Sequence, residues 1–275
     1  MSPNPSAAPV CRVRLCYAKR GKLRFTSHRD VARAFERALR RAGLPMAYSQ
    51  GYHPHPKVSW VGAAPTGAAS EAEYVEIALV EHLDPETVRV QLDAALPDGL
   101  AVLEGVLAGP GALAERIDAS AWRIEVRGVD GAQLRRAAGL LLAAPEALVE
   151  RVSKDGLRSI DARAAIVSLE VEDVSTVLPE PDHLVRCGIL VAVVRQASPA
   201  VRPDDVLSAL GAVGGLPSSA LVKAIRTAQG RLDEDGGLVD PLAADRASAR
   251  MAVAGNALTQ SDGGSHQLDV AGHTG

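Results

Sequence analysis

The sequence predicts an α+β protein with two tandem ferredoxin-like domains, or one such domain followed by a variant, and a disordered C-terminal tail. Segments of strand and helix periodicity in the first half follow the order β-α-β-β-α-β, which is the ferredoxin-like order. The second half begins with the same succession, and the end of the chain loses its periodicity and becomes rich in Gly, Ser, Asp and Ala. We therefore expect a basic N-terminal ferredoxin-like domain at residues 11–108, a second α+β domain at 120–228 and a mostly disordered tail at 229–275.

The best-marked element of the first domain is a helix over residues 27–42. Ser27 can cap its first turn, and Asp30 stands three residues later, as in a capping box. Gly43 suits the left-handed position after the last turn, and Pro45 prevents continuation. A second helix is expected at 84–96, because Pro85 is favoured at a first helical position. Strands are expected at residues 13–18, 23–25, 46–50, 74–80 and 100–107, with a long irregular connection at 62–72.

The second domain repeats part of this pattern. A strand at 122–127 precedes a helix at 130–142, and strands at 147–152 and 157–161 flank a turn that contains Gly156, which is typical of a hairpin. Strands at 166–171 and 184–195 and helices at 203–210 and 217–227 complete the domain, with Lys223 and Arg226 on the exposed face of the last helix. Within the tail, a helical turn or two is expected at 243–253.

Positive charge is concentrated between Arg12 and Trp60. This segment contains twelve Lys and Arg residues against Asp30 and Glu36, a net charge of about +10, whereas the rest of the chain carries about −13. The near-neutral total therefore hides a basic module within an otherwise acidic protein. A concentrated positive field is typical of a surface that meets phosphates.

The arginines of the helix at 27–42 fall on one side of it. At about 100° per residue, Val31, Phe35 and Leu39 lie on the opposite side and are expected to pack. Arginines four residues apart repel one another by about a few tenths of a kcal/mol per pair, and Glu36 is the only acid on the helix body. Anion binding would explain this arrangement, and a solvated charged face is the alternative interpretation. The arginine stripe consists of Arg29, Arg33, Arg37, Arg40 and Arg41.

The segment after this helix combines stiffness with polar and aromatic side chains. Pro54 and Pro56 fix their own φ angles and bias the preceding residues toward extended backbone, so we expect residues 50–60 to be stiff and exposed. His53 and His55 could bind a metal together with His28, or the imidazoles could act as general acid and base in RNA cleavage. A rigid turn whose imidazoles hydrogen-bond locally or touch phosphates is the third interpretation. The side chains that a single-stranded nucleic acid would meet here are Tyr52, His53, His55, Lys57 and Trp60.

The remaining composition narrows the class of protein. The longest run of apolar residues and glycine, at 187–194, is too short to cross a bilayer, and the N-terminal segment lacks an apolar signal core. We therefore expect a cytoplasmic protein. An odd number of cysteines, three, argues against a disulfide framework. We expect neither a cofactor nor a metal site.

Several strings in the sequence carry a family resemblance. The first half contains RFTSHRDVARAFERALRRAGLP, YSQGYHPHPKVSW and GAAPTGAASEAEYVEIAL, and the second half contains SKDGLRSIDARAAIVSLEV and VRPDDVLSALG. These strings resemble the radical SAM-linked (radical SAM-associated) protein family, whose function is uncharacterised. The resemblance implies a separate radical SAM enzyme as partner, because this chain lacks the Cys-x-x-x-Cys-x-x-Cys triplet that holds such an enzyme's iron–sulfur cluster. The architecture is also distantly similar to the CRISPR-associated RAMP proteins, which bind RNA on ferredoxin-like domains.

The leading hypothesis is an RNA-binding accessory protein that presents a transfer or ribosomal RNA to a separate radical SAM enzyme. In this hypothesis the arginine stripe contacts phosphates, and Tyr52 and Trp60 stack on bases. His53, His55 and Lys57 orient the RNA backbone. Two alternatives differ in class: a metal-independent endoribonuclease that uses histidines of the basic module, and a protein-interaction subunit that binds no nucleic acid.

Overall fold

The computed structural model describes residues 7–153, 156–179, 184–217 and 222–251. Two helices and four strands make up most of the first half. In chain order its elements are β1 (Cys11–Lys19), the short 3-10 helix η1 (Gly21–Phe25), α1 (His28–Arg41), β2 (Val58–Val61), β3 (Ala69–Leu79), α2 (Pro85–Ala95) and β4 (Leu100–Leu107).

The second half begins after a 3-10 helix, η2 (Leu113–Arg116). The described part of the chain ends in a helix over residues 243–251. Between them lie β5 (Ala119–Arg127), α3 (Gly131–Ala143), β6 (Leu148–Ser153), β7 (Gly156–Asp161), α4 (Ala162–Ala165), β8 (Ile166–Pro179), β9 (Leu184–Arg195), α5 (Pro203–Gly214), β10 (Val222–Leu232) and β11 (Leu238–Val239).

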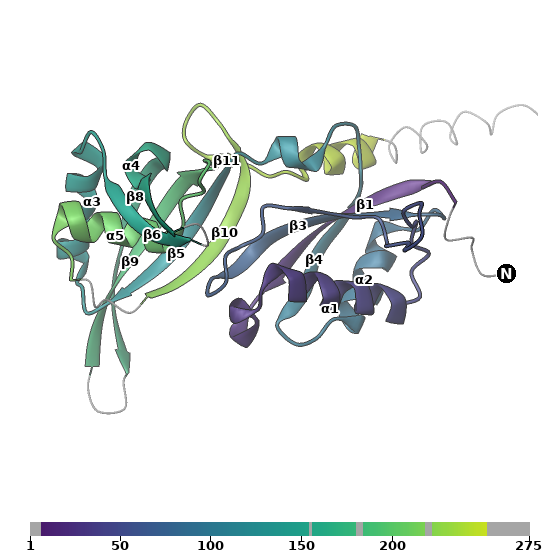
Figure 1. The fold of residues 1–275 in the computed structure, drawn as a ribbon, viewed down its shortest axis with the longest axis horizontal. Coiled ribbons are helices and arrows are strands. Elements are labelled where there is room, and N and C mark those ends of the chain that lie inside the picture. The colour runs from purple at the N-terminus through teal and green to yellow at the C-terminus, as the bar shows by residue number, and fades with distance from the viewer. Residues whose placement is uncertain (1–6, 154–155, 180–183, 218–221, 252–275) are drawn as a thin grey trace, which may run out of the picture.

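One mixed sheet of nine strands runs through both halves (Figure 1). Its strands lie in the order β4-β1-β3-β10-β5-β9-β8, with β2 beside β3 and β11 beside β10, while β6 and β7 form a separate pair. The halves join where β10 pairs in parallel with the start of β3, so that Arg226 lies opposite Ser70. Further along β3, residues 74–77 pair with β2 instead. One edge of β3 therefore pairs with β10 of the second half at its start and with β2 of the first half further along.

Each half contains four antiparallel strands in the same relative order. In the first half, β4, β1, β3 and β2 are successive neighbours. In the second half, β10, β5, β9 and β8 are successive neighbours, again antiparallel throughout. The β6-β7 hairpin stands between α3 and β8 along the chain and pairs with none of these strands. These elements confirm the prediction of an α+β protein.

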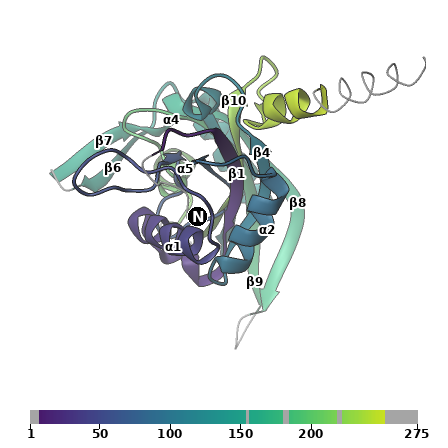
Figure 2. The same cartoon turned by 90° about the vertical axis from the view of Figure 1, so that its right-hand side faces the viewer.

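Helices pack on the sheet in both halves (Figures 1 and 2). A mostly aliphatic core is buried in each half. The first core joins Phe35 and Leu39 of α1 and Leu92 of α2 to the strands beneath them. The second core joins α3 and α5 to β5 and β9 in the same way. Removal of these side chains from water stabilises the arrangement of helices on the sheet. Fully buried residues of the second core include Ile124, Leu134, Leu141, Leu190 and Leu210.

The helix predicted at residues 27–42 is confirmed as α1. The Ser27 side chain accepts a hydrogen bond from the Asp30 amide at 3.3 Å, which satisfies one of the free donors at the helix start. Gly43 ends the helix with a φ of 66°, a conformation that costs glycine little. The buried residues of α1 recur at helical spacing, so the opposite face is left to solvent. They are Val31, Phe35, Ala38 and Leu39.

Two predicted strands of the first domain are wrong. Residues 23–25 lie in the 3-10 helix η1 rather than in a strand. Residues 46–50 form only isolated bridges, one from Met46 to Leu79 and one from Tyr48 to Pro56. Since β2 already pairs with residues 74–77 of β3, only the end of that strand is left for Met46. The predicted connection at 62–72 is also shorter, because β3 begins at Ala69.

The predicted helix at 217–227 is wrong where the structure describes it. Residues from Val222 onward form β10, which fills the space between β3 and β5 and pairs with both. Pairing on both sides satisfies the backbone of this segment, which outweighs its helical pattern. Arg226, expected on an exposed helix face, is only 5% exposed. Residues 218–221 lie outside the described residues.

The first part of the predicted tail belongs to the fold. Residues 229–232 continue β10, β11 pairs with it, and residues 243–251 form the helix expected near there. Leu242 and Asp245 of this segment are buried, at 0% and 2% exposure. The prediction of disorder is therefore wrong for 229–242, and the helix expected at 243–253 is confirmed over 243–251. Residues 252–275 lie outside the described residues.

Candidate nucleic-acid interface and a cleft between the halves

The five arginines of the α1 stripe are all exposed. Arg33 lies 3.5 Å from the Asp30 carboxylate, and both side chains are more than half exposed, at 61% and 56%. Arg40 donates a hydrogen bond to the Glu36 carbonyl within the helix. In the described part of the chain, no ion pair joins Arg29, Arg37, Arg40 or Arg41 to a carboxylate. An exposed pair such as Asp30 with Arg33 is weak, so it offsets little of the charge of the stripe.

The loop after α1 projects its side chains into solvent. Its two ends are held together by Ser49, whose amide donates to the His55 carbonyl at 2.8 Å and whose hydroxyl accepts from the His55 amide at 3.0 Å. Tyr52 is 95% exposed, and its ring meets the His53 ring edge-on at a centroid distance of 5.1 Å. His55 and Lys57 are exposed as well. The segment is therefore closed at its base by these hydrogen bonds and exposed to solvent, and the exposure agrees with the prediction.

Trp60, the last predicted contact residue, has a different environment. It is partly buried on β2 and meets three rings edge-on, those of Phe35 at 5.1 Å, His28 at 5.3 Å and Tyr17 at 6.0 Å. Such contacts fix the indole against the core of the first half. The structure thus brings Trp60 together with His28, and Tyr52 together with His53.

The structure offers no support for a metal site built from these imidazoles. Among the described residues, no group of three or more His, Cys, Asp or Glu side chains is placed to hold a metal ion. His28 is held against Trp60, while His53 contacts Tyr52 in the loop.

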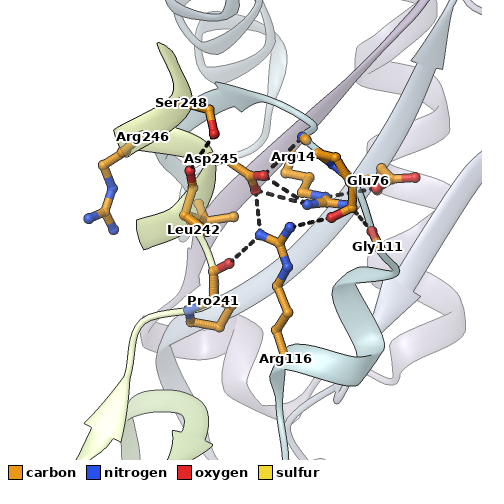
Figure 3. A network of polar contacts seen from close by, with 12 residues as sticks. Arg14, Glu76, Gly111, Arg116, Pro241, Leu242, Asp245, Arg246 and Ser248 are labelled. Atoms are coloured by element: carbon orange, nitrogen blue, oxygen red, sulfur yellow. Dashed lines mark hydrogen bonds and ion pairs between the residues drawn. The ribbon is translucent and has the colours of Figure 1, made fainter. Parts of the chain in front are cut away.

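A buried polar network joins the helix at 243–251 to the first half (Figure 3). Asp245 accepts two hydrogen bonds from Nη1 of Arg14, at 3.0 and 2.9 Å, and one from Nη1 of Arg116 at 2.8 Å. Arg14 also donates from Nε to Glu76 at 2.8 Å. The side chains of Arg14 and Asp245 are only 2% and 1% exposed. Buried charges of this kind must be paired, so this cluster fastens the C-terminal segment to the sheet.

The charge state of Asp245 follows from this network. Burial alone would raise the pKa of its carboxyl group, because burial disfavours the charged form. Hydrogen bonds from Arg14, from the Gly109 amide and from Arg116 oppose burial and hold the pKa of Asp245 below its ordinary value of 3.8. The Asp245 carboxylate is therefore charged in the folded protein at neutral pH.

A second buried network lies where β3 meets β10. Arg226 donates to Glu73 at 3.1 Å and to the Gly62 carbonyl, and its guanidinium stacks on the Trp122 ring at 4.7 Å. Glu73 also accepts from the Ala64 amide at 2.9 Å. Burial lowers the pKa of Arg226, and the nearby charge of Glu73 opposes that effect. These contacts fix the connection between β2 and β3 against the second half.

Beside this network lies a cleft of about 480 Å³, which we call the seam cleft. Its wall combines residues of both halves, and none of the residues that line it is acidic. Both tryptophans of the chain are among them. Sequence reasoning missed the cleft because it placed Arg226 in a helix, and the scarcity of tryptophan was the one available signal. The polar and aromatic lining residues are Trp60, Ser120, Trp122, Arg195, Gln196, Arg202, Arg226 and Gln229.

Residues 12–203 match a family model described as "Uncharacterized protein conserved in bacteria (DUF2344)". The matched span includes α1 and the loop after it, whereas β10 and the helix at 243–251 lie beyond it. Among curated proteins, none matches this chain.

Two solved structures are distantly similar. DyPB from Rhodococcus jostii RHA1 is 10% identical, with 80% of this chain and 94% of that chain covered and a TM-score of 0.21. The encapsulated DyP-type peroxidase from Mycobacterium smegmatis is 9% identical, with 83% and 94% covered and a TM-score of 0.20. Similarity at these scores carries no argument about this chain. Within the described residues, no helix is long and apolar enough to cross a membrane.

Proposed function

Since this chain belongs to the uncharacterised bacterial family DUF2344, we propose a function from its own residues: it is an RNA-binding accessory protein that presents RNA to a separate radical SAM enzyme. The main observation that supports the proposal of RNA binding is the exposed arginine stripe of α1. Four arginines of the stripe have no ion pair with a carboxylate among the described residues, and the fifth has only the exposed Asp30.

The spacing of the stripe favours a ligand over a structural role. Arg29, Arg33, Arg37 and Arg41 follow one another at four-residue intervals, an arrangement that destabilises a helix slightly. Their charges do not hold the fold together, because the opposite face of α1 does the packing. Phosphates along an RNA strand would neutralise them and release counterions, which is a large source of affinity.

The loop after α1 supplies the second part of the proposed interface. Tyr52, His53, His55 and Lys57 are exposed. In this proposal Tyr52 would stack on a base, and the other three would contact the RNA backbone. Trp60 can contribute only the part of its indole that its aromatic neighbours leave uncovered. The arginines then determine affinity, and the loop contributes contacts with bases.

The radical SAM partner rests on the sequence resemblance. The three cysteines are compatible with an accessory role, since Cys11 and Cys16 lie on β1 and Cys187 is buried on β9 in the other half. Burial raises the pKa of Cys16 to about 12, which disfavours its thiolate form. An iron–sulfur protein with the Cys-x-x-x-Cys-x-x-Cys motif should therefore co-purify with this chain after nuclease treatment. Recovery of the chain with no such protein would contradict the partnership.

We further propose that both halves are ferredoxin-like units. The antiparallel orders β4-β1-β3-β2 and β10-β5-β9-β8 support this proposal, because each places the fourth strand beside the first and the second strand at an edge. In the second unit the β6-β7 hairpin and α4 would be insertions before the second strand. The parallel pairing of β3 with β10 would then join two units into one sheet.

RNA binding is tested by reversing charge on α1. We expect Arg33→Glu combined with Arg37→Glu to weaken binding of a fluorescein-labelled single-stranded RNA, measured by anisotropy at fixed salt, by at least about tenfold. The matched control is Arg136→Glu with Arg250→Glu, which makes the same charge change at exposed arginines outside the stripe. The control should bind nearly as the parent protein does.

Three outcomes would contradict this function. Equal affinities for the stripe variant and the parent protein would exclude the stripe as the contact surface. Cleavage of the RNA in the presence of a chelator, lost in His53→Ala, would show a ribonuclease instead of a binding protein. No binding to transfer, ribosomal or single-stranded RNA would leave a protein as the partner of α1.

A further inference from the structure

The seam cleft has the chemistry of a ligand site that is separate from α1. Arg195 and Arg202 line it, both are exposed, and neither has an ion pair with a carboxylate within the described chain. Because no acidic residue lines the cleft, these two arginines give it a positive field. Guanidinium groups of this kind bind phosphate through paired hydrogen bonds.

The lining of the cleft also includes aromatic and buried polar side chains. It contains Trp60 and Trp122, and the guanidinium of Arg226 is stacked on the second of these rings. Nε of Arg226 and Oε1 of Gln229 are buried and have no hydrogen-bond partner among the described residues. Unused buried donors and acceptors are uncommon in folded proteins, and they are frequently explained by a missing ligand or water.

Gly62 also lines the cleft, and its backbone packs closely against the side chain of Gln229. It has a φ of 56°, and a Cβ atom at this position would lie 2.5 Å from Oε1 of Gln229. Arg226 donates to the carbonyl of the same glycine, so the β2-β3 connection is fixed against β10. The site is therefore built into the junction between the halves.

We propose that the seam cleft binds one nucleotide, either free or as a residue of an RNA strand. Arg195 and Arg202 would take the phosphate, while the partly exposed indole of Trp60 and the exposed amide of Gln196 would contact the base. The cleft volume of about 480 Å³ lies in the range of small-molecule sites. Trp60 belongs to both sites, but none of the α1 arginines lines the cleft, so this binding does not depend on the arginine stripe.

Intrinsic fluorescence gives a direct readout, because the only two tryptophans of the chain both line the cleft. The full-length protein is titrated with AMP, with adenosine and with an eight-residue oligoadenylate, and emission is corrected for absorbance with free N-acetyltryptophanamide. We expect a saturable change in emission with AMP or with the oligomer, and weaker binding of adenosine because it lacks the phosphate. A response to AMP identifies a free nucleotide as a sufficient ligand. A response to the oligomer alone identifies a nucleotide within a strand if it persists in Arg33→Glu with Arg37→Glu, and binding at α1 if it is lost there, which would contradict the proposal.

Charge reversal at the cleft provides the decisive comparison. Arg195→Glu with Arg202→Glu should weaken the responding ligand by at least about tenfold. The control pair Arg136→Glu with Arg250→Glu should leave the affinity for AMP unchanged, and so should the α1 pair Arg33→Glu with Arg37→Glu. Equal unfolding temperatures would show that the exposed substitutions leave the fold intact. The proposal is overturned if neither AMP nor the oligomer changes the emission, or if the cleft and control variants respond equally.

The single-tryptophan variants locate the ligand. Trp122→Phe leaves Trp60 as the only emitter, and Trp60→Phe leaves Trp122. A ligand in the cleft should change the emission of both variants. A response from neither would place binding elsewhere and contradict the proposal.

Discussion

The arginines cluster in two regions of the molecule and have different surroundings in each. At the junction between the halves, Arg14 and Arg226 are buried and hydrogen-bonded to carboxylates from distant parts of the chain. On α1, the arginines face solvent, and only Arg33 is paired with an acid among the described residues. Buried charge that is paired holds elements together, whereas exposed charge without partners is available to a ligand.

Sequence composition does not distinguish the buried arginines from the exposed arginines of α1. Both groups contribute to the positive charge of the protein, and Arg14 lies within the same basic module as α1. Only the structure shows that Glu76 and Asp245 neutralise Arg14. Removal of a buried charge at the junction should therefore lower stability. Removal of an exposed arginine charge on α1 should instead weaken the binding of a partner.

The largest expected effect is at the junction. Asp245→Asn should lower the free energy of unfolding by about 3–5 kcal/mol, because it removes the charge that Asp245 provides to the buried Arg14 and the partly buried Arg116. Urea denaturation followed by circular dichroism measures this change. Asp98→Asn, an exposed acid, is the matched control and should change stability by less than about 0.5 kcal/mol. Similar values for the two variants would contradict the structural role of the network.

The same carboxylate should make stability depend on acid. Asp245 has a pKa below 3.8 in the folded protein, so the unfolded chain binds its proton at a higher pH than the folded chain does. Its stabilising contribution is thus fully present above pH 3.8 and is lost as the pH falls through the folded pKa. The stability difference between the parent protein and Asp245→Asn should shrink over that window. A difference that grows with acid would contradict the assignment.

A smaller effect is expected at the start of α1. Ser27→Ala removes the cap that accepts from the Asp30 amide and should cost about 1 kcal/mol. Ser27→Asp keeps an acceptor and should restore most of that stability. If both variants melt like the parent protein, the cap contributes nothing measurable.

The smallest effect concerns the stripe itself. Arg37→Glu replaces two repulsive four-residue contacts, with Arg33 and Arg41, by attractive ones, so it should raise stability by about a few tenths of a kcal/mol. Arg37→Ala should be nearly neutral. A loss above about 1 kcal/mol in either variant would show that the exposed arginines are structural after all.

Features of the fold that depend on residues close in sequence could be predicted, whereas contacts between distant parts of the chain could not. The bounds of α1 follow from Ser27, Gly43 and Pro45, which are close in sequence, and the exposure of its arginines follows from the spacing of Phe35 and its neighbours. The Arg226–Glu73 pair spans 153 residues and the Arg14–Asp245 pair spans 231. No local pattern encodes such a pairing.

The same reason explains the missed strand and the missed cleft. The segment that becomes β10 reads as a helix by its own spacing, and it is a strand because the edges of β3 and β5 are both open to it. The seam cleft exists only once that strand is in place, since Arg226 and Gln229 belong to it.

The salt dependence of RNA binding tests the central claim most directly. The logarithm of the association constant is measured against the logarithm of salt concentration for the parent protein and for Arg29→Gln, Arg33→Gln, Arg37→Gln and Arg41→Gln. If these side chains contact phosphates, each substitution should reduce the slope by about 0.7, while Arg136→Gln should leave it unchanged. Equal slopes for the α1 and Arg136 variants would show that the stripe does not meet the RNA.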